Sequence, residues 1–171
     1  MMHEIMIKCL NKKFLSWDMV EDAATKALHS ILKSNVKYDL ILAVGRGGMV
    51  PARIVSEQLG IKSVYMLGGI HAYDDGKSEF RDVVIDGRLS LPDVSGNDIL
   101  LVDDCVTTGK TLEVAEHVLK VAGASSASSI VLFKNIHNNS CIYYGEEYDA
   151  DKSWLVFPWE KKLVNEEEGA K

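Results

Sequence analysis

Apolar residues recur at helical spacing near the start of the chain and form short continuous runs further along it. Between Asp18 and Leu32 they fall three and four positions apart, at Met19, Val20, Ala23, Ala27, Leu28, Ile31 and Leu32. This spacing predicts a helix with one buried face. Ser16 or Asp18 is the expected N-cap, because either side chain can accept a hydrogen bond from the first free amides of the helix.

Short apolar runs alternate with helical segments over the rest of the chain. The run from Leu40 to Val44 is apolar throughout, which is typical of a strand buried on both faces. Further strands are expected at Ser63 to Leu67, Asp82 to Ile85, Ile99 to Val102 and Ile130 to Phe133, and helices at Met49 to Gly60 and Leu112 to Ala122. The alternation predicts an α/β fold: a doubly wound, mainly parallel sheet with helices on both faces and ligands at the carboxyl ends of its strands.

Two segments fall outside this pattern. The stretch from Gly68 to Arg81 is polar, contains glycines and is too long for a tight turn, which predicts a mobile flap. The stretch from Asn165 to Lys171 is acidic and rich in small residues, which predicts a frayed end. With 171 residues, 47% of them apolar, the chain is expected to form a single domain over residues 1–171.

Composition excludes several classes of partner. A net charge of −6 opposes binding to a nucleic-acid backbone, and no run of lysine or arginine offsets it. Cys9, Cys105 and Cys141 are an odd set without CxxC spacing, and the N-terminus lacks the apolar core of a signal peptide. We therefore expect a cytoplasmic protein that binds neither nucleic acid nor a membrane. Cys105 is expected to pack rather than to react, and the histidines show no metal-ligand spacing.

The stretch from Asp98 to Thr111 carries the most chemical information. In it an apolar strand ends in Asp103 and Asp104, and a hydroxyl-rich glycine turn then opens a helix. Adjacent carboxylates at a strand end can hold vicinal hydroxyls or the shell of a Mg²⁺ ion, and the amides of the turn favour a phosphate. The pattern predicts a ribose-phosphate site. A Walker A loop is excluded, because it needs a glycine where this chain has Asp104.

A second glycine-rich turn follows the run from Leu40 to Val44. Its residues Gly45, Arg46, Gly47 and Gly48 offer exposed amides and one guanidinium, which suits a pyrophosphate. Alone, such a turn is also explained by tight packing between a strand and a helix. Because turns that follow parallel strands meet at one edge of the sheet, we expect this loop to lie beside the acidic pair.

Together these motifs resemble the type I phosphoribosyltransferases, and most closely the 6-oxopurine enzymes that act on xanthine, guanine or hypoxanthine. Five segments occur in that family's order: Ser16 to Met19, Arg46 to Pro51, the phosphoribosyl-pyrophosphate (PRPP) motif around Asp103, Phe133 with Lys134, and Trp154 to Glu160. The resemblance implies the type I fold with a small hood from the terminal segments, and a homo-oligomer, either a dimer or a tetramer. It also implies Mg²⁺-dependent transfer of 5-phosphoribose from PRPP to a base in purine salvage, with release of pyrophosphate.

The same resemblance assigns the phosphate and metal contacts. Asp103 and Asp104 would hold the ribose hydroxyls and the water shell of Mg²⁺, and Arg46 with its neighbouring glycines would bind pyrophosphate. The 5′-phosphate would lie on the loop formed by Thr107, Thr108, Gly109, Lys110 and Thr111. The resemblance further suggests that the peptide between Gly45 and Arg46 is cis or strained.

The resemblance also names residues for the base and for closure of the site. Lys134 would donate to the purine O6, while Trp154 and Leu155 would form the apolar wall and backbone edge that hold the ring. Tyr73 and Lys77 are the expected contributors from the flap, which would exclude water from the reacting centre.

Thr107 departs from the 6-oxopurine pattern. That family usually has an aspartate here, thought to handle the proton on purine N7, and an alcohol is no base near neutral pH. Orotate phosphoribosyltransferases resemble this chain in having threonine at this place, so transfer to a pyrimidine or to adenine stays open. A second alternative is a regulator that binds PRPP without turnover, although the chain has no appended helix-turn-helix and no basic face.

Overall fold

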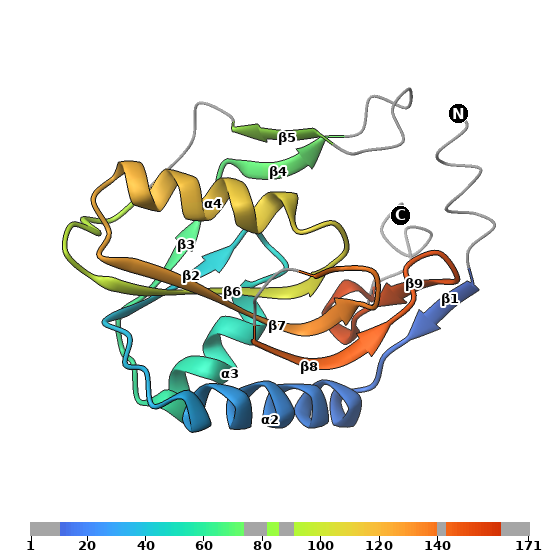
Figure 1. The fold of residues 1–171 in the computed structure, drawn as a ribbon. Coiled ribbons are helices and arrows are strands. Elements are labelled where there is room, and N and C mark those ends of the chain that lie inside the picture. Colours follow the sequence, from blue (N-terminus) through green and yellow to red (C-terminus); the bar gives the residue numbers. More distant parts are fainter. Residues whose placement is uncertain (1–10, 74–81, 86–90, 140–142, 162–171) are drawn as a thin grey trace, which may run out of the picture.

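The computed structural model describes residues 11–73, 82–85, 91–139 and 143–161. In this part of the chain a five-stranded sheet forms the centre of the molecule (Figure 1), with the order β3-β2-β6-β7-β8 and parallel neighbours throughout. Its strands are β2 (Leu40–Val44), β3 (Val64–Leu67), β6 (Asp98–Val106), β7 (Ser126–Asn135) and β8 (Tyr143–Tyr148). The predicted doubly wound, mainly parallel sheet is confirmed.

Helices cover both faces of the sheet. As Figure 1 shows, α2 (Trp17–Ser34) and α3 (Met49–Leu59) lie on one face, and α4 (Lys110–Val121) lies on the other. The N-cap of α2 is Ser16 rather than Asp18, because the Ser16 hydroxyl accepts a hydrogen bond from the Met19 amide at 3.2 Å. Within the described ranges, none of these helices combines the length and apolar character needed to cross a membrane.

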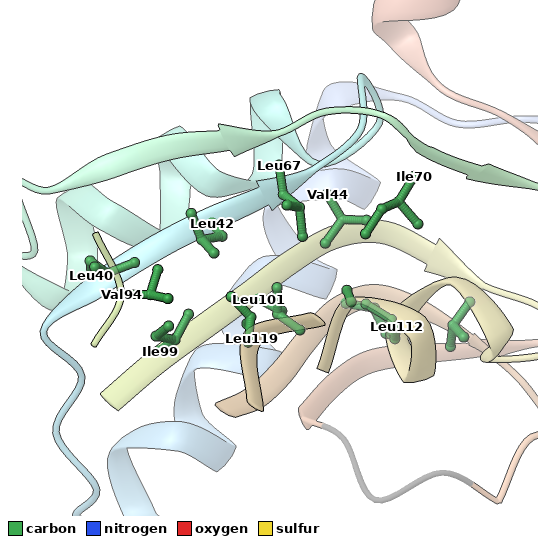
Figure 2. Close-up of a cluster of buried hydrophobic side chains, with 13 residues drawn as sticks. Leu40, Leu42, Val44, Leu67, Ile70, Val94, Ile99, Leu101, Leu112 and Leu119 are labelled. Atoms are coloured by element: carbon green, nitrogen blue, oxygen red, sulfur yellow. The ribbon is translucent and has the colours of Figure 1, made fainter. Parts of the chain in front are cut away.

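Apolar side chains fill the space on both sides of the sheet. Toward α4, Leu42 and Leu101 belong to the same buried cluster as Leu119 (Figure 2). Toward α2 and α3, Ile41 and Leu100 belong to a second buried cluster. Successive residues of a strand point to opposite faces, so a strand covered on both faces must be apolar at every position. This explains why the whole of β2 is apolar and buried.

The terminal segments build a small second sheet beside the first. Strand β1 (Asn11–Phe14) pairs in parallel with β9 (Ser153–Val156), and the short helix η1 (Pro158–Glu160) follows. A third buried cluster ties this hood to the main body through Leu155 and Phe157, which pack with Phe133 of β7. The hood that the resemblance implied is therefore present. Residues 165–171 lie outside the described part of the chain.

The predicted flap contains regular structure. Strand β4 (Ile70–Tyr73) falls inside the segment from Gly68 to Arg81 and pairs antiparallel with β5 (Asp82–Ile85). The strand expected at residues 82–85 therefore forms, but it belongs to this separate pair and not to the central sheet. Tyr73 ends β4, whereas Lys77 lies outside the described residues.

The strand predicted to end at Val102 is longer than expected. β6 continues through Asp103, Asp104 and Cys105 to Val106, and Cys105 and Val106 still pair with β7. The prediction failed because two adjacent carboxylates are normally unfavourable in a buried strand. The acidic pair therefore lies inside the strand, with Cys105 and Val106 after it, and not at its last two positions.

Candidate active site

Asp103 and Asp104 lie near the carboxyl end of β6, the middle strand of the five in the central sheet. Each carboxylate is fixed by the amide of the next residue. The Asp104 amide donates to Asp103 Oδ1 at 2.9 Å, and the Cys105 amide donates to Asp104 Oδ1 at 2.6 Å. The second oxygen of each carboxylate takes no part in these bonds, so a bound hydroxyl or cation can use it.

Burial makes this pair electrostatically costly. It raises the pKa of Asp103 well above its usual value, and the adjacent charge of Asp104 raises it further. Burial also raises the pKa of Asp104 to about 6, with a smaller contribution from the Glu160 carboxylate. A divalent cation removes such repulsion, and carboxylate oxygens are the ligands that Mg²⁺ prefers. These residues fit the metal that the resemblance implies.

Glu160 is a further carboxylate on the side of the acidic pair, and the sequence did not single it out. It lies in η1 of the hood, where its Oε2 accepts a hydrogen bond from the Phe157 amide at 2.8 Å. Its influence on the pKa of Asp104 shows that the hood brings a third carboxylate toward the acidic pair. It belongs to the segment from Trp154 that carries the family resemblance, yet its nearness to Asp104 arises only from the fold.

The glycine loop lies directly against the acidic pair. A β-carbon on Gly47 would lie only 2.5 Å from Asp104 Oδ2, and one on Gly48 would lie 2.2 Å from the Val102 carbonyl oxygen. Only glycine allows both approaches. The expected meeting of the two motifs at one edge of the sheet is therefore observed, and it also places the exposed Arg46 beside that edge.

The backbone of this loop is less unusual than the resemblance suggested. Gly45 takes a left-handed conformation with φ 55°, which glycine adopts without strain. All peptide bonds in the described residues are trans, including the one between Gly45 and Arg46. The expectation of a cis bond was wrong for this structure.

The predicted phosphate loop connects β6 to α4. Thr107 and Thr108 are exposed, Gly109 has φ 84° and caps the helix, and α4 begins at Lys110. The backbone amides of the first turn, which includes Lys110 and Thr111, point out of the amino end of the helix, where the Lys110 amide donates to Thr108 Oγ1 at 3.5 Å. Such an end favours an anion, so this loop is suited to a phosphate.

Lys134 sits at the carboxyl end of β7, and most of its side chain is buried. Its Nζ donates to the Asn138 carbonyl oxygen at 3.2 Å, lies 3.0 Å from Glu147 Oε1 and is 4.5 Å from the centre of the Tyr144 ring. The ion pair lowers the pKa of Glu147. An ammonium has three donors, and the Asn138 carbonyl oxygen and the Glu147 carboxylate account for two of them.

Trp154 and Leu155, which the resemblance assigns to the base, both lie on β9 of the hood. Leu155 is buried in the cluster that includes Phe133, the neighbour of Lys134 on β7. Trp154 is half-buried and pairs in register with Lys12 of β1. The hood thus brings Leu155 to the strand that carries Lys134.

Three residues around Thr107 were not expected from sequence. The Tyr148 hydroxyl lies 2.9 Å from Thr107 Oγ1. The side-chain amides of Asn135 and Asn138 both donate to the Thr107 carbonyl oxygen at 3.4 Å. Cys105 lies nearby, and burial raises the pKa of its thiol well above the usual value, which supports a packing role.

One histidine does meet carboxylates in the fold. His137 Nε2 lies 3.7 Å from Asp151 Oδ2, and Asp149 completes a group whose ligand atoms lie within 4.8 Å of one another. Lys152 already pairs with Asp149 at 2.7 Å, so a cation is present in this group without a metal. Sequence spacing did not indicate the group, because His137 lies far before Asp149 and Asp151 in the chain and meets them only in the fold.

A parallel sheet whose carboxyl edge joins an acidic pair, a glycine-arginine loop and an anion-binding helix end defines a class of enzymes that handle sugar phosphates. Residues 12–163 match the family of phosphoribosyl transferase domains, and the chain belongs to this family. The resemblance inferred from sequence is thereby confirmed, and the protein is a phosphoribosyltransferase.

The chain is similar to several proteins that are named as purine enzymes. The chain is 29% identical over 153 residues to a xanthine-guanine phosphoribosyltransferase of Idiomarina loihiensis, covering 88% of each chain. It is 30% identical to the enzyme of that name from Desulfotalea psychrophila, over 85% of this chain and 84% of the relative. The crystal structure of a purine phosphoribosyltransferase from Pyrococcus horikoshii superposes with a TM-score of 0.69 at 28% identity, covering 92% of this chain and 99% of the other.

Proposed function

We propose that this phosphoribosyltransferase moves 5-phosphoribose from PRPP to a 6-oxopurine base, namely hypoxanthine, guanine or xanthine, and releases pyrophosphate in a Mg²⁺-dependent reaction. The observation that carries the proposal is the contact between the Gly47 backbone and the Asp104 carboxylate. This contact joins a loop suited to pyrophosphate to a pair suited to ribose and a cation. The names of the relatives support a purine as acceptor.

The reaction needs charge stabilisation more than covalent help from the protein. Breaking the bond between C1 of the ribose and pyrophosphate places positive charge on the sugar and negative charge on the leaving group. Arg46 and the amides of its loop would bind the leaving pyrophosphate. Asp103 and Asp104 would orient the ribose hydroxyls and would hold a Mg²⁺ ion, which when bound neutralises pyrophosphate charge. The start of α4 would fix the 5′-phosphate, so that C1 meets the base in line.

On the acceptor side, Lys134 would select the base. Its remaining donor suits the O6 of an oxopurine, where negative charge develops as the ring becomes nucleophilic. Adenine has an amino group at this position. That group donates hydrogen bonds, and an ammonium has no acceptor for them. The hood residues Trp154 and Leu155 would supply the apolar surface for the ring. As in the family resemblance, we further propose a dimer or a tetramer.

Pyrophosphate release with PRPP, Mg²⁺ and a panel of bases tests this proposal. We expect release with hypoxanthine, guanine or xanthine and none with adenine, orotate or uracil. Release with orotate or adenine alone would support the second candidate, transfer to another base, which Thr107 favours. Release without any base would mean hydrolysis of PRPP, and no release under any condition would overturn both candidates.

Asp103→Asn and Asp104→Asn should each lose at least about tenfold in PRPP affinity or turnover, because each removes a charge that faces the metal and the ribose. The stability of both variants should rise. Burial raises the pKa values of Asp103 and Asp104, which means that ionising them costs stability as the pH rises, so each variant should melt at a higher temperature than wild type.

Kinetics and melting curves check this prediction together. The matched control is Asp39→Asn, at the opposite edge of the sheet, where Asp39 Oδ2 accepts a hydrogen bond from the Asp98 amide at 2.8 Å. That variant should lose stability and keep activity. Wild-type PRPP affinity and turnover in both site variants would remove the acidic pair from the active site.

Lys134→Ala should impair transfer to 6-oxopurines by about tenfold or more, since a charge-assisted hydrogen bond to O6 is lost. Pyrophosphate inhibition should stay near its wild-type value. Lys26→Ala is the control, because Lys26 also pairs with a glutamate of β8, Glu146, but on an exposed surface. Steady-state kinetics with varied base tests whether Lys134 recognises O6. An equal loss of activity on every base tested would count against this recognition.

A further inference from the structure

Lys134 is held by the neighbouring strand β8 as well as by its own loop. It pairs in register with Glu147, and its Nζ lies 3.0 Å from Glu147 Oε1 and 4.5 Å from the centre of the Tyr144 ring. The Lys134 side chain is 12% exposed and that of Glu147 is 47% exposed. A carboxylate this close to a mostly buried ammonium cancels much of its charge, because water screens the pair mainly from the Glu147 side.

Glu147 carries a negative charge over the neutral pH range. The hydrogen bond from Lys134, and then the charge of Lys134, lower the pKa of the Glu147 carboxyl below its usual value. A carboxyl group with a lowered pKa stays ionised near neutral pH. The two side chains together therefore carry no net charge. The ammonium remains a hydrogen-bond donor, but its attraction for an anion is weakened.

This neutral pair lies at the carboxyl edge of the central sheet. Lys134 pairs in register with Val106, the last residue of β6, and it is linked through Asn138 to the Thr107 carbonyl oxygen. The acidic pair, which also lies on β6, adds negative charge to the same edge. A neutral ligand needs only the donor that Lys134 offers. An anionic ligand would gain little more, because Glu147 offsets the charge of Lys134.

We propose that Glu147 is a specificity-determining residue that makes the base site selective for the neutral 6-oxopurines, hypoxanthine and guanine, over the xanthine anion. This inference rests on the proposed function, because it assumes that the base lies against Lys134. Xanthine loses a ring proton near neutral pH, whereas hypoxanthine and guanine stay neutral there. An ammonium without a carboxylate partner would attract the xanthine anion, and pairing with Glu147 removes that attraction.

Glu147→Gln tests the role of this charge, because glutamine keeps the shape of the side chain and a carbonyl oxygen that can accept from the ammonium. The ratio of kcat/KM for xanthine to kcat/KM for hypoxanthine should rise about tenfold over wild type at about pH 8, where xanthine is largely an anion. At about pH 6, where xanthine is neutral, the variant should keep the wild-type ratio. Titration of the acidic pair affects both bases alike and cancels in the ratio.

The neighbouring glutamate of β8 provides the matched control. Glu146 pairs with Lys26 on an exposed surface, so Glu146→Gln removes the same charge from another ion pair of the same strand. It should keep the wild-type ratio at both pH values. Glu147→Asp keeps the charge, and it should also keep the ratio near that of wild type, even if activity with every base falls.

The ratio separates charge selection from a structural role, because a structural role for Glu147 would lower activity with both bases equally. An unchanged ratio in Glu147→Gln at the higher pH would overturn the proposal, and so would an equal rise in Glu146→Gln. If Glu147→Gln does not fold, the wild-type protein decides. Its preference for hypoxanthine over xanthine should grow from the lower to the higher pH, and a constant preference would overturn the proposal. Failure of the proposed function appears differently, as no pyrophosphate release with any oxopurine.

Discussion

Replacing Gly47 with alanine should lower kcat/KM for PRPP by about 100-fold while the protein stays folded. The new β-carbon would lie 2.5 Å from Asp104 Oδ2 and 2.9 Å from Oδ1, so the carboxylate must move away from its present position. Displacement of a catalytic group by about 1 Å commonly costs this much rate. Because the contact is with a side chain and not with backbone, the fold can adapt. Initial rates with varied PRPP and a melting curve measure the two effects.

Gly96→Ala is the opposite control for this variant. Gly96 has φ 71° and open space around it, so alanine there should cost about 1 kcal/mol of stability through backbone strain and leave activity unchanged. Gly47→Ala should instead lose activity with PRPP and keep its stability. If Gly47→Ala retains full activity with PRPP, then the loop and the acidic pair do not work as one site.

Arg46→Ala should weaken inhibition by pyrophosphate by about 1.5 to 3 kcal/mol, the usual range for a hydrogen bond that involves a charged group. Binding of the nucleotide product should change little, because the nucleotide has no pyrophosphate to contact this loop. Product-inhibition constants for the two ligands measure the difference.

Arg53→Ala gives a suitable comparison, since Arg53 is exposed on α3 and pairs with Glu57 at 2.7 Å. It should leave both inhibition constants unchanged. An Arg46→Ala variant that loses affinity for nucleotide and pyrophosphate alike would point to general damage of the site, and the assignment of this loop to the leaving group would be wrong.

The elements that build the carboxyl edge of the central sheet could be predicted from sequence because their patterns are local. The apolar run of β2 and the spacing of α2 report burial directly, and glycines after β2 and β6 mark sharp turns at a ligand edge. Parallel topology then places both turns at one edge, which is why the contact between Gly47 and Asp104 was foreseeable.

The hood and the flap strand could not be predicted in the same way. All four residues of β1 are exposed, so they show no alternation, and β1 exists only because it pairs with β9 about 140 residues later. Strand β4 is likewise short and has its partner in β5. Such strands are specified by pairing and not by local sequence.

Contacts between distant segments explain the site residues that sequence reasoning missed. Tyr148 meets Thr107 across 41 positions, and Glu160 reaches Asp104 only through the hood. Neither residue belongs to a motif with its partner. Their influence on the acidic pair and on the phosphate loop became visible only when the strand order was known.

Direct identification of the nucleotide product tests the central claim best. The enzyme is incubated with PRPP, Mg²⁺ and hypoxanthine, guanine or xanthine, and the nucleoside monophosphate and pyrophosphate are both quantified. The account predicts equal amounts of the two products, formed only when PRPP and an oxopurine are present together. Pyrophosphate without nucleotide, or a nucleotide formed only from adenine or orotate, would contradict it.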